Sequence, residues 1–241
     1  MLYSKSMPRG LREFEVGGIY HIIQRGVEKR KIFLKDQDYS RFIFGLEFFN
    51  QVNPINLWDF LAKVGTVPTL AIQVERARKG SSLVELLAFA LMPNHYLLLV
   101  REIQRGGISL FMRKMGGYST YFNKQYERVG PLFQSRYKAV PIKTTEQLQT
   151  VFVYVHTNPV ELRESEWKNL YVRDRENAIQ WLRSYRWSSY HDYTGTENFP
   201  FATQRNFFLD FFAGAEGCRE AVESWITFKS ENTLLDVSLM E

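Results

Sequence analysis

The chain has 241 residues, of which 45% are hydrophobic and 15% aromatic, enough to bury a sizeable core in one large domain or in one domain with an extension. No apolar run reaches the about 18 residues of a membrane-spanning helix, and the first residues lack the apolar stretch of a signal peptide. Cys218 is the only cysteine, which excludes an internal disulfide and a cysteine-based zinc site, so we expect a cytoplasmic protein.

The charge is distributed unevenly along the chain. The formal net charge is +5, but residues 1–160 hold 22 Lys and Arg against 12 Asp and Glu, whereas residues 161–241 hold 9 against 14. A basic first part with an acidic second part predicts a polyanionic partner for the first. The alternative is a solvated surface rich in lysine and arginine.

The first elements are predicted from apolar periodicity. Residues 18–25 are rich in β-branched and aromatic side chains and predict a strand, and residues 36–49 have helical spacing with Asp36 as the N-cap candidate. Residues 51–82 contain two prolines and two glycines and are interpreted as an insertion. Residues 83–101 predict one strand or a strand pair, so apolar that a central place in a sheet is expected.

The next predicted elements lie between residues 108 and 158, in the second half of the basic part of the chain. Residues 108–126 predict one helix in spite of Gly116 and Gly117, and residues 132–142 predict a strand on which Gln134, Arg136 and Lys138 share a face. Thr144 and Gln147 have the spacing of a capping box and begin a helix that continues to Asn158. Further helices are expected around residues 207–212 and 218–228.

Two short segments contain candidate chemistry. Residues 92–100 place His95 on an apolar strand, and residues 154–160 place Tyr154 and Asn158 on one face of a helix that Pro159 helps to end. A tyrosine hydroxyl, with a pKa near ~10, attacks a phosphate only if the phosphate is polarised or the proton is removed. A histidine nitrogen and an asparagine oxygen are suitable metal ligands. The alternative is a hydrogen-bonded core histidine, a packed tyrosine and a simple helix stop.

These two segments and their flanks resemble the REP-associated tyrosine transposases of the HUH single-tyrosine superfamily. The flanking matches are residues 20–26, 121–123, 130–138 and 187–190, in the same order, within about residues 15–195. The resemblance implies an α+β fold of ferredoxin-like type, with an antiparallel sheet flanked by helices. It implies an HUH transposase core in residues 1–160, interrupted by the insertion at 51–82, and a helical extension packed on it in residues 161–241.

The resemblance also implies a reaction. Members of that family cut and rejoin single-stranded DNA beside a hairpin through a 5′-phosphotyrosine link, with Mg²⁺ or Mn²⁺ bound by two histidines and a polar residue of the tyrosine helix. It assigns the nucleophile to Tyr154, the first metal ligand to His95 and the third to Asn158. Single-stranded or hairpin DNA is then the expected partner of a nucleoid-associated monomer or homodimer.

One residue departs from the family pattern. The pattern requires histidine, a hydrophobic residue and histidine, but this chain has His95, Tyr96 and Leu97. Because leucine binds no metal, we expect a weakened metal site, unless His21 from a neighbouring strand compensates. Two hypotheses remain open: an active transposase-like nuclease, and a relative that binds hairpin DNA without cutting it.

DNA contacts are expected from the basic part of the chain, where salt-dependent phosphate contacts come from lysine and arginine. Aromatic residues beside them, Tyr118, Tyr121, Phe133 and Tyr137, are candidates for stacking on unpaired bases. The alternative for the basic residues is a solvated edge. The predicted DNA-binding residues are Arg25, Lys29, Arg30, Lys31, Arg113, Lys114, Arg136 and Lys138.

Overall fold

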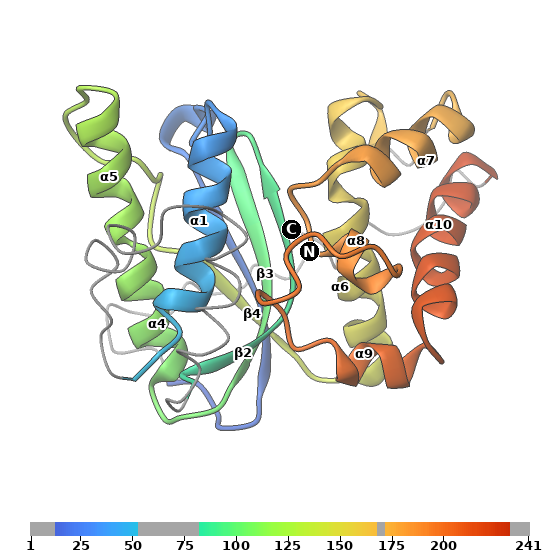
Figure 1. Ribbon diagram of the computed structural model, residues 1–241, viewed down its shortest axis with the longest axis horizontal. Coiled ribbons are helices and arrows are strands. Elements are labelled where there is room, and N and C mark those ends of the chain that lie inside the picture. Colours follow the sequence, from blue (N-terminus) through green and yellow to red (C-terminus); the bar gives the residue numbers. More distant parts are fainter. Residues whose placement is uncertain (1–12, 53–81, 168–171, 232–241) are drawn as a thin grey trace, which may run out of the picture.

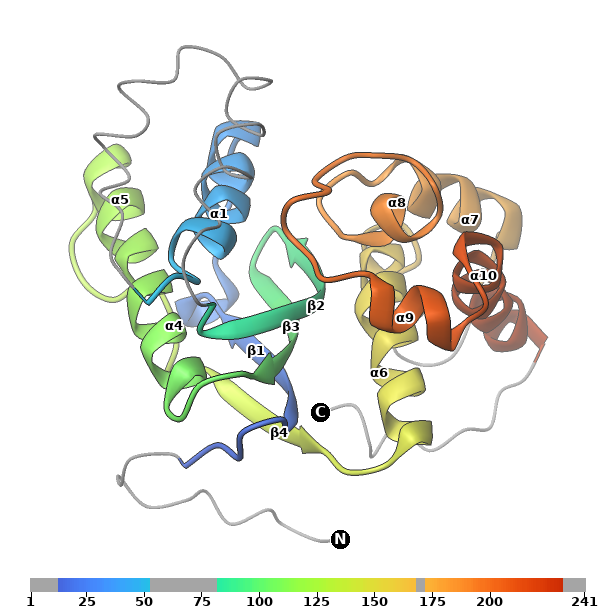
Figure 2. The ribbon, with the colours of Figure 1, turned by 60° about the horizontal axis from the view of Figure 1, so that its bottom comes forward.

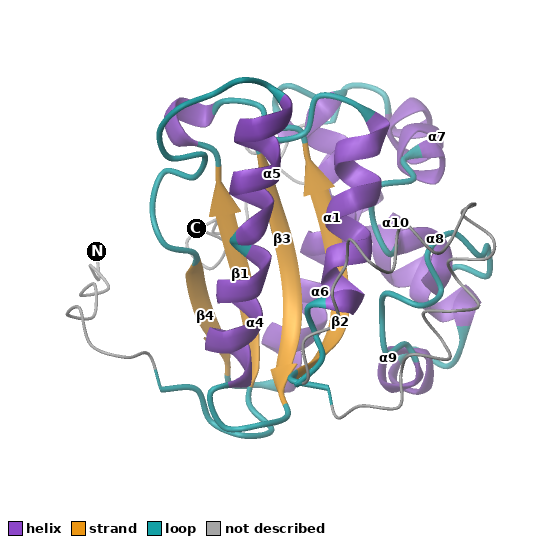
Figure 3. Cartoon of the chain, turned by 60° about the vertical axis from the view of Figure 1, so that its left-hand side comes forward, coloured by secondary structure: helices purple, strands orange, loops and turns teal. Residues whose placement is uncertain are grey.

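A four-stranded antiparallel sheet lies at the centre of the molecule. The computed structural model describes residues 13–52, 82–167 and 172–231, and its strands have the order β2-β3-β1-β4 (Figure 3). The predicted α+β class, an open antiparallel sheet flanked by helices, is confirmed. The strands are β1 (Ile19–Arg25), β2 (Val84–Met92), β3 (His95–Glu102) and β4 (Lys138–Ile142).

Helices cover both faces of the sheet (Figure 1). The first face is covered by α1 (Asp36–Phe48), α4 (Gly107–Met115) and α5 (Gly117–Gln125). On the second face α6 (Thr145–Thr157) packs directly on the strands and lies between the sheet and α10 (Ala215–Glu231). The remaining elements are the short 3-10 helices η1 (Val27–Lys29) and η2 (Asn158–Leu162), and α7 (Arg175–Ser184), α8 (Tyr190–Tyr193) and α9 (Asn206–Phe211).

Alternation along the strands produces two apolar cores. On β3, Leu98 and Val100 point to the first face, whereas Leu97 and Leu99 point to the second, and all four are buried. The helices α7 to α10 gather around the outer side of α6 (Figure 2). Ring contacts such as Phe152 on Phe208, with centroids 4.2 Å apart, join α6 to them.

The strand pair predicted over residues 83–101 is present, and its second strand, β3, lies inside the sheet as predicted. The apolar strand β2 lies at the edge of the sheet, which corrects the central place predicted for it. Its outer side is covered by a C-terminal segment, because Leu91 N–H donates to the Trp187 carbonyl and Ser189 N–H donates to the Phe89 carbonyl. The strand is therefore buried like a central one, and its edge is not open to pairing with another chain.

Three predicted boundaries are also corrected. The N-cap of α1 is Lys35, not Asp36, because the Asp38 carboxylate accepts hydrogen bonds from the N–H groups of Leu34 and Lys35. The single helix expected over residues 108–126 is divided at Gly116 into α4 and α5. The last predicted strand is shorter, since β4 begins only at Lys138.

Other predictions hold or lie outside the described residues. The Thr144 hydroxyl accepts from Gln147 N–H at 3.2 Å, as the capping-box spacing predicted, and α9 and α10 occupy the two helical stretches expected near the C-terminus. Nearly all of the expected insertion, residues 53–81, lies outside the described residues. Within the described ranges, no helix is both long and apolar enough to cross a lipid bilayer.

Candidate active site

The helix α6 positions two of the predicted site residues. Tyr154 lies in its last turn, and Asn158 follows at its C-terminal end with helical φ and ψ of −54° and −36°. The two residues are therefore one turn apart, as predicted. Just beyond, the Trp181 indole N–H donates to the Pro159 carbonyl at 2.9 Å and ties this end of α6 to α7.

A tight turn positions His95 at the start of β3. Gly26 N–H donates to the Asn94 carbonyl at 2.8 Å, and Ile32 N–H donates to the Pro93 carbonyl at 2.7 Å. These bonds hold the turn between β2 and β3 against the end of β1. His95 is 4% exposed, so its ring direction is determined by packing and by its two nitrogen contacts.

The two nitrogens of His95 face two asparagine oxygens. Nδ1 lies 2.7 Å from Asn94 Oδ1, and Nε2 lies 3.2 Å from Asn158 Oδ1. In the neutral ring, Nδ1–H donates to Asn94, and the Nε2 lone pair then faces another acceptor. A cation shared by Nε2 and Oδ1 satisfies both, as does an Asn158 amide rotated to donate from its nitrogen.

The position expected for the second histidine is apolar. Leu97 is 1% exposed, faces the same side of β3 as His95 and lies opposite Ile23 of β1. Within the described residues, no three His, Cys, Asp or Glu side chains gather in an arrangement that could hold a metal. His95 and Asn158 thus fit two positions of a metal site, and Leu97 does not fit the third.

His21 does not take the place of the missing ligand. Its strand β1 does pair with β3, and His95 lies opposite Arg25. His21, however, is four residues before Arg25 on that strand and lies opposite Leu99. Four residues of a strand span about 13 Å, too far for a shared ion. The ring of His21 instead packs edge-on against Tyr154, with centroids 5.8 Å apart and planes at 82°. The suggestion that His21 compensates for Leu97 is therefore wrong.

A cavity of about 320 Å³ brings the candidate nucleophile and the candidate metal ligand together, and we call it the Tyr154 cavity. Tyr154 from α6 and His95 from β3 both line it, and Tyr154 is half-buried. Three predicted DNA-binding residues, Arg25, Arg136 and Lys138, line it as well. The other lining residues are Ile23, Gln24, Leu97, Gln134 and Ser135.

The remaining predicted DNA-binding residues are not in this cavity. Lys29 lies in η1 directly after β1, and Arg30 and Lys31 follow it; Lys29 and Lys31 are exposed. Arg113 and Lys114 end α4 on the opposite face of the sheet. There the Lys114 ammonium donates to the Gln51 carbonyl at 2.5 Å, and burial together with Arg113 lowers the pKa of Lys114.

Most of the candidate stacking aromatics belong to the core on the first face. Tyr118 is buried and donates its hydroxyl proton to the Ile32 carbonyl at 2.6 Å, and Tyr121 donates to Asp38 at 3.0 Å. Phe133 and Tyr137 are half-buried and pack against the same core. Packing accounts for these rings without any base.

His156, the histidine between Tyr154 and Asn158, has a structural role. Its Nδ1 lies 2.9 Å from the Phe152 carbonyl and its Nε2 lies 2.8 Å from Ser189 Oγ. Burial lowers its pKa to about 3, although the Phe152 carbonyl acts in the opposite direction. The ring therefore stays neutral and connects α6 to the segment that covers β2.

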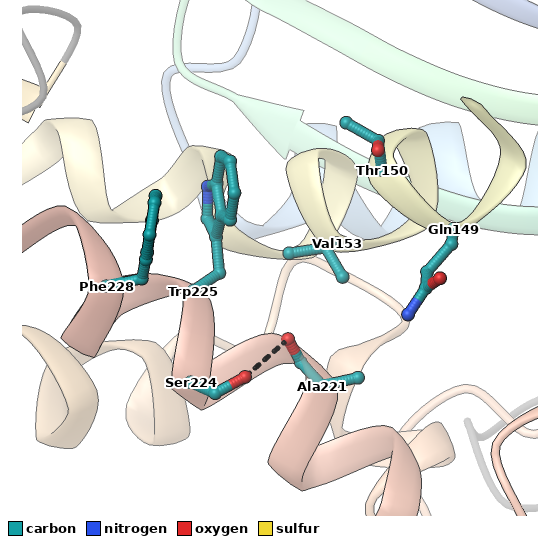
Figure 4. A pocket seen from close by; sticks show the side chains of 7 residues that line it. All are labelled: Gln149, Thr150, Val153, Ala221, Ser224, Trp225 and Phe228. Carbon is teal, nitrogen blue, oxygen red and sulfur yellow. Dashed lines mark hydrogen bonds between the residues drawn. The ribbon is translucent and has the colours of Figure 1, made fainter. Parts of the chain in front are cut away.

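A larger cavity, of about 440 Å³, lies between α6 and α10 (Figure 4). It is lined by Gln149, Thr150, Val153, Ala221, Ser224, Trp225 and Phe228. This set includes no acid, no base and none of the predicted site residues. The Tyr154 cavity is therefore the better candidate for chemistry.

Comparison with known proteins found a similar family and a similar solved structure. The sequence model of a family described as IS200-like transposase matches residues 71–158, which include both His95 and Tyr154. A solved structure described as a REP-associated tyrosine transposase bound to a REP hairpin is similar, with 16% identity and a TM-score of 0.47. That match covers 83% of this chain and 93% of the other chain. No curated protein matches the chain.

Proposed function

We propose that this chain is a DNA transposase that cuts and rejoins single strands beside hairpins. The similarity of residues 71–158 to the IS200-like transposase family supports the proposal. The observation that carries the proposal is the Tyr154 cavity, in which a tyrosine, a histidine and three cationic side chains meet. A phosphodiester is the substrate that suits this combination, because its negative charge matches the cations. The preference for hairpins follows from the resemblance of the two motif segments.

In the proposed reaction Tyr154 is the nucleophile. Its Oη forms a bond to the scissile phosphorus, and the bond from that phosphorus to the 3′ oxygen breaks. The tyrosine proton passes to solvent, and the released 3′ oxygen takes up a proton to become a hydroxyl. The product is a 5′-phosphotyrosine link, and attack on it by another 3′-hydroxyl would rejoin a strand.

His95 and Asn158 are the residues that would hold Mg²⁺ or Mn²⁺ in this proposal. Such an ion polarises a phosphate oxygen as a Lewis acid. Asn94 would assist by accepting a hydrogen bond from Nδ1–H of His95. This contact orients the ring so that the lone pair on Nε2 points toward Asn158. Leu97 leaves the second histidine position without a donor, so we expect weaker metal binding than in a complete site.

A second candidate function is binding of hairpin DNA without cutting. The observation that favours it is the buried Leu97, which removes a ligand and leaves the cationic side chains of the cavity in place. In this second candidate the protein binds hairpin DNA but does not cut it.

A cleavage assay distinguishes the two. Labelled single-stranded hairpin DNA from the flanks of the gene is incubated with Mn²⁺ or Mg²⁺ and the wild-type protein, and the covalent protein–DNA adduct is measured on a denaturing gel. We expect an adduct that disappears in Tyr154→Phe. Tight binding without an adduct, with cutting gained in Leu97→His, would establish the second candidate instead.

Tyr20→Phe is the matched control for the loss of a tyrosine hydroxyl. Tyr20 packs on the first face of the sheet, and its hydroxyl accepts from Glu15 N–H at 2.9 Å. We expect this variant to form the adduct as the wild type does.

A further inference from the structure

The strand register places Lys138 in the same row across the sheet as Leu97, which occupies the position of the missing second histidine. On the face that α6 covers, Leu97 of β3 lies opposite Ile23 of β1, and Ile23 lies opposite Lys138 of β4. In the adjacent row Arg25 lies opposite His95. Lys138 is thus two strand spacings, about 10 Å, from Leu97, and its flexible four-carbon stem can reach over Ile23.

The three cations of the Tyr154 cavity have no acidic partner among the described residues. No ion pair involves Arg25, Arg136 or Lys138 there, and no Asp or Glu lines the cavity. Arg136 and Lys138 are exposed and Arg25 is half-buried, so all three are accessible to a ligand that enters the cavity.

This charge arrangement favours a phosphate over a metal ion. The remaining metal ligands, His95 and Asn158, are neutral donors, and three positive side chains near a divalent ion oppose its binding. The same side chains attract a phosphodiester, and an arginine fork binds two phosphate oxygens at once. Arginine and lysine clamps are one established means of stabilising phosphoryl transfer.

We propose that Arg25, Arg136 and Lys138 clamp the scissile phosphate and supply the charge neutralisation that Leu97 has removed from the metal site, so that Tyr154 cuts DNA without a divalent ion. The inference rests on the proposed cutting by Tyr154, and in it the clamp replaces the metal ion of that proposal. The clamp stabilises the negative charge that develops on the non-bridging phosphate oxygens while the bond from Tyr154 Oη forms and the bond to the 3′ oxygen breaks.

The test is a single-turnover measurement of adduct formation in EDTA and in Mn²⁺. We expect the wild-type rate in EDTA to be within about tenfold of the rate in Mn²⁺. Lys138→Gln and Arg136→Gln should each lower the EDTA rate by about 100-fold, the loss typical of removing one preorganised transition-state contact. Leu97→His should raise the ratio of the Mn²⁺ rate to the EDTA rate, because it restores a ligand.

Binding is measured separately from chemistry. Each substitution is combined with Tyr154→Phe, and the dissociation constant for fluorescent hairpin DNA is obtained by anisotropy. We expect only a few-fold weaker binding for Lys138→Gln. Lys124→Gln is the matched control, because Lys124 is an exposed lysine of α5 on the other face of the sheet. It should change neither the rate nor the binding.

The outcomes separate the two proposals. An adduct that forms in Mn²⁺ and is absent in EDTA would overturn the clamp and leave the proposed function standing. A rate loss in Lys138→Gln that is fully explained by weaker binding would also overturn the clamp. No adduct in the wild type under either condition would refute the proposed cutting activity itself.

Discussion

At the scale of single residues, two buried histidines contribute to the pH dependence of the stability of this protein. Burial, and next the charge of Lys138, lowers the pKa of His21 from 6.5 to about 4. Burial lowers the pKa of His156 to about 3. Both values lie below the value of an unfolded histidine, so the unfolded chain binds protons that the folded chain does not bind.

We therefore predict that the free energy of unfolding is independent of these histidines above about pH 6.5 and falls as the pH drops from there toward 4. Each histidine contributes at most about 1.4 kcal/mol per pH unit. Urea unfolding at several pH values between 7.5 and 5 measures the slope. His21→Phe should reduce the slope, because it removes one of the two groups.

The His21→Phe variant also tests how much the unpaired Nε2 atom of His21 lowers the free energy of unfolding. Nε2 of His21 is buried and has no hydrogen-bond partner in the described part of the chain. Its removal in His21→Phe should stabilise the protein by about 1 kcal/mol. A slope equal to that of the wild type would show that His21 is not buried as a neutral ring.

Helical spacing was enough to predict that Tyr154 and Asn158 share a face, and the structure has them one turn apart. The environment of His21 was not predictable in the same way. Its neighbours depend on the register in which β1 pairs with β3 and β4, where His21 lies opposite Leu99 and Val140. Local sequence patterns do not contain this information.

At the scale of elements, Asp38 joins two helices that are far apart in sequence. Its buried carboxylate accepts from Leu34 and Lys35 N–H before α1, and from the hydroxyls of Tyr121 and Tyr126 at 3.0 and 2.7 Å. Burial, and next this hydrogen bond, raises the pKa of Tyr121 to about 12. Asp38 therefore holds the start of α1 against α5.

We predict that Asp38→Ala lowers the free energy of unfolding by about 3 kcal/mol, because several buried donors lose a charged acceptor together. Chemical denaturation measures the change. Asp36→Asn is the matched control: Asp36 is exposed in the same first turn, and its substitution should cost less than about 1 kcal/mol. Equal losses in the two variants would contradict the role given to Asp38.

Element boundaries were predicted best where a local signal marks them. Thr144 and Gln147 marked the start of α6 correctly, since capping needs only neighbouring residues. The edge position of β2 was missed because residues 187–189, about a hundred positions later in the chain, cover that edge. A strand buried by distant residues has the composition of a central one.

At the scale of the whole molecule, the basic part of the chain predicts salt-dependent binding to DNA. Each phosphate neutralised on a single strand contributes about −0.7 to the slope of log affinity against log salt concentration. We predict that Lys138→Gln in the Tyr154→Phe background makes this slope shallower by about one such contact. Anisotropy titrations between low and moderate salt provide the measurement, and an unchanged slope would mean that Lys138 touches no phosphate.

The two faces of the sheet differ, and the candidate site lies on one of them. The first face of the sheet is closed by α1, α4 and α5 and by an aromatic core that includes Tyr118. On the second face α6 packs directly on the strands, and Tyr154 of that helix lines the Tyr154 cavity. Arg113 and Lys114, on the closed face, are thus separated from the cavity by the sheet.

The 3.2 Å contact between His95 and Asn158 joins β3 and α6 within one polypeptide. Since Tyr154 belongs to the same α6, one molecule contains the proposed nucleophile and the groups proposed to assist it. For the proposed reaction we therefore expect strand cutting to be first order in the protein–DNA complex, with a rate per bound molecule that does not change on dilution.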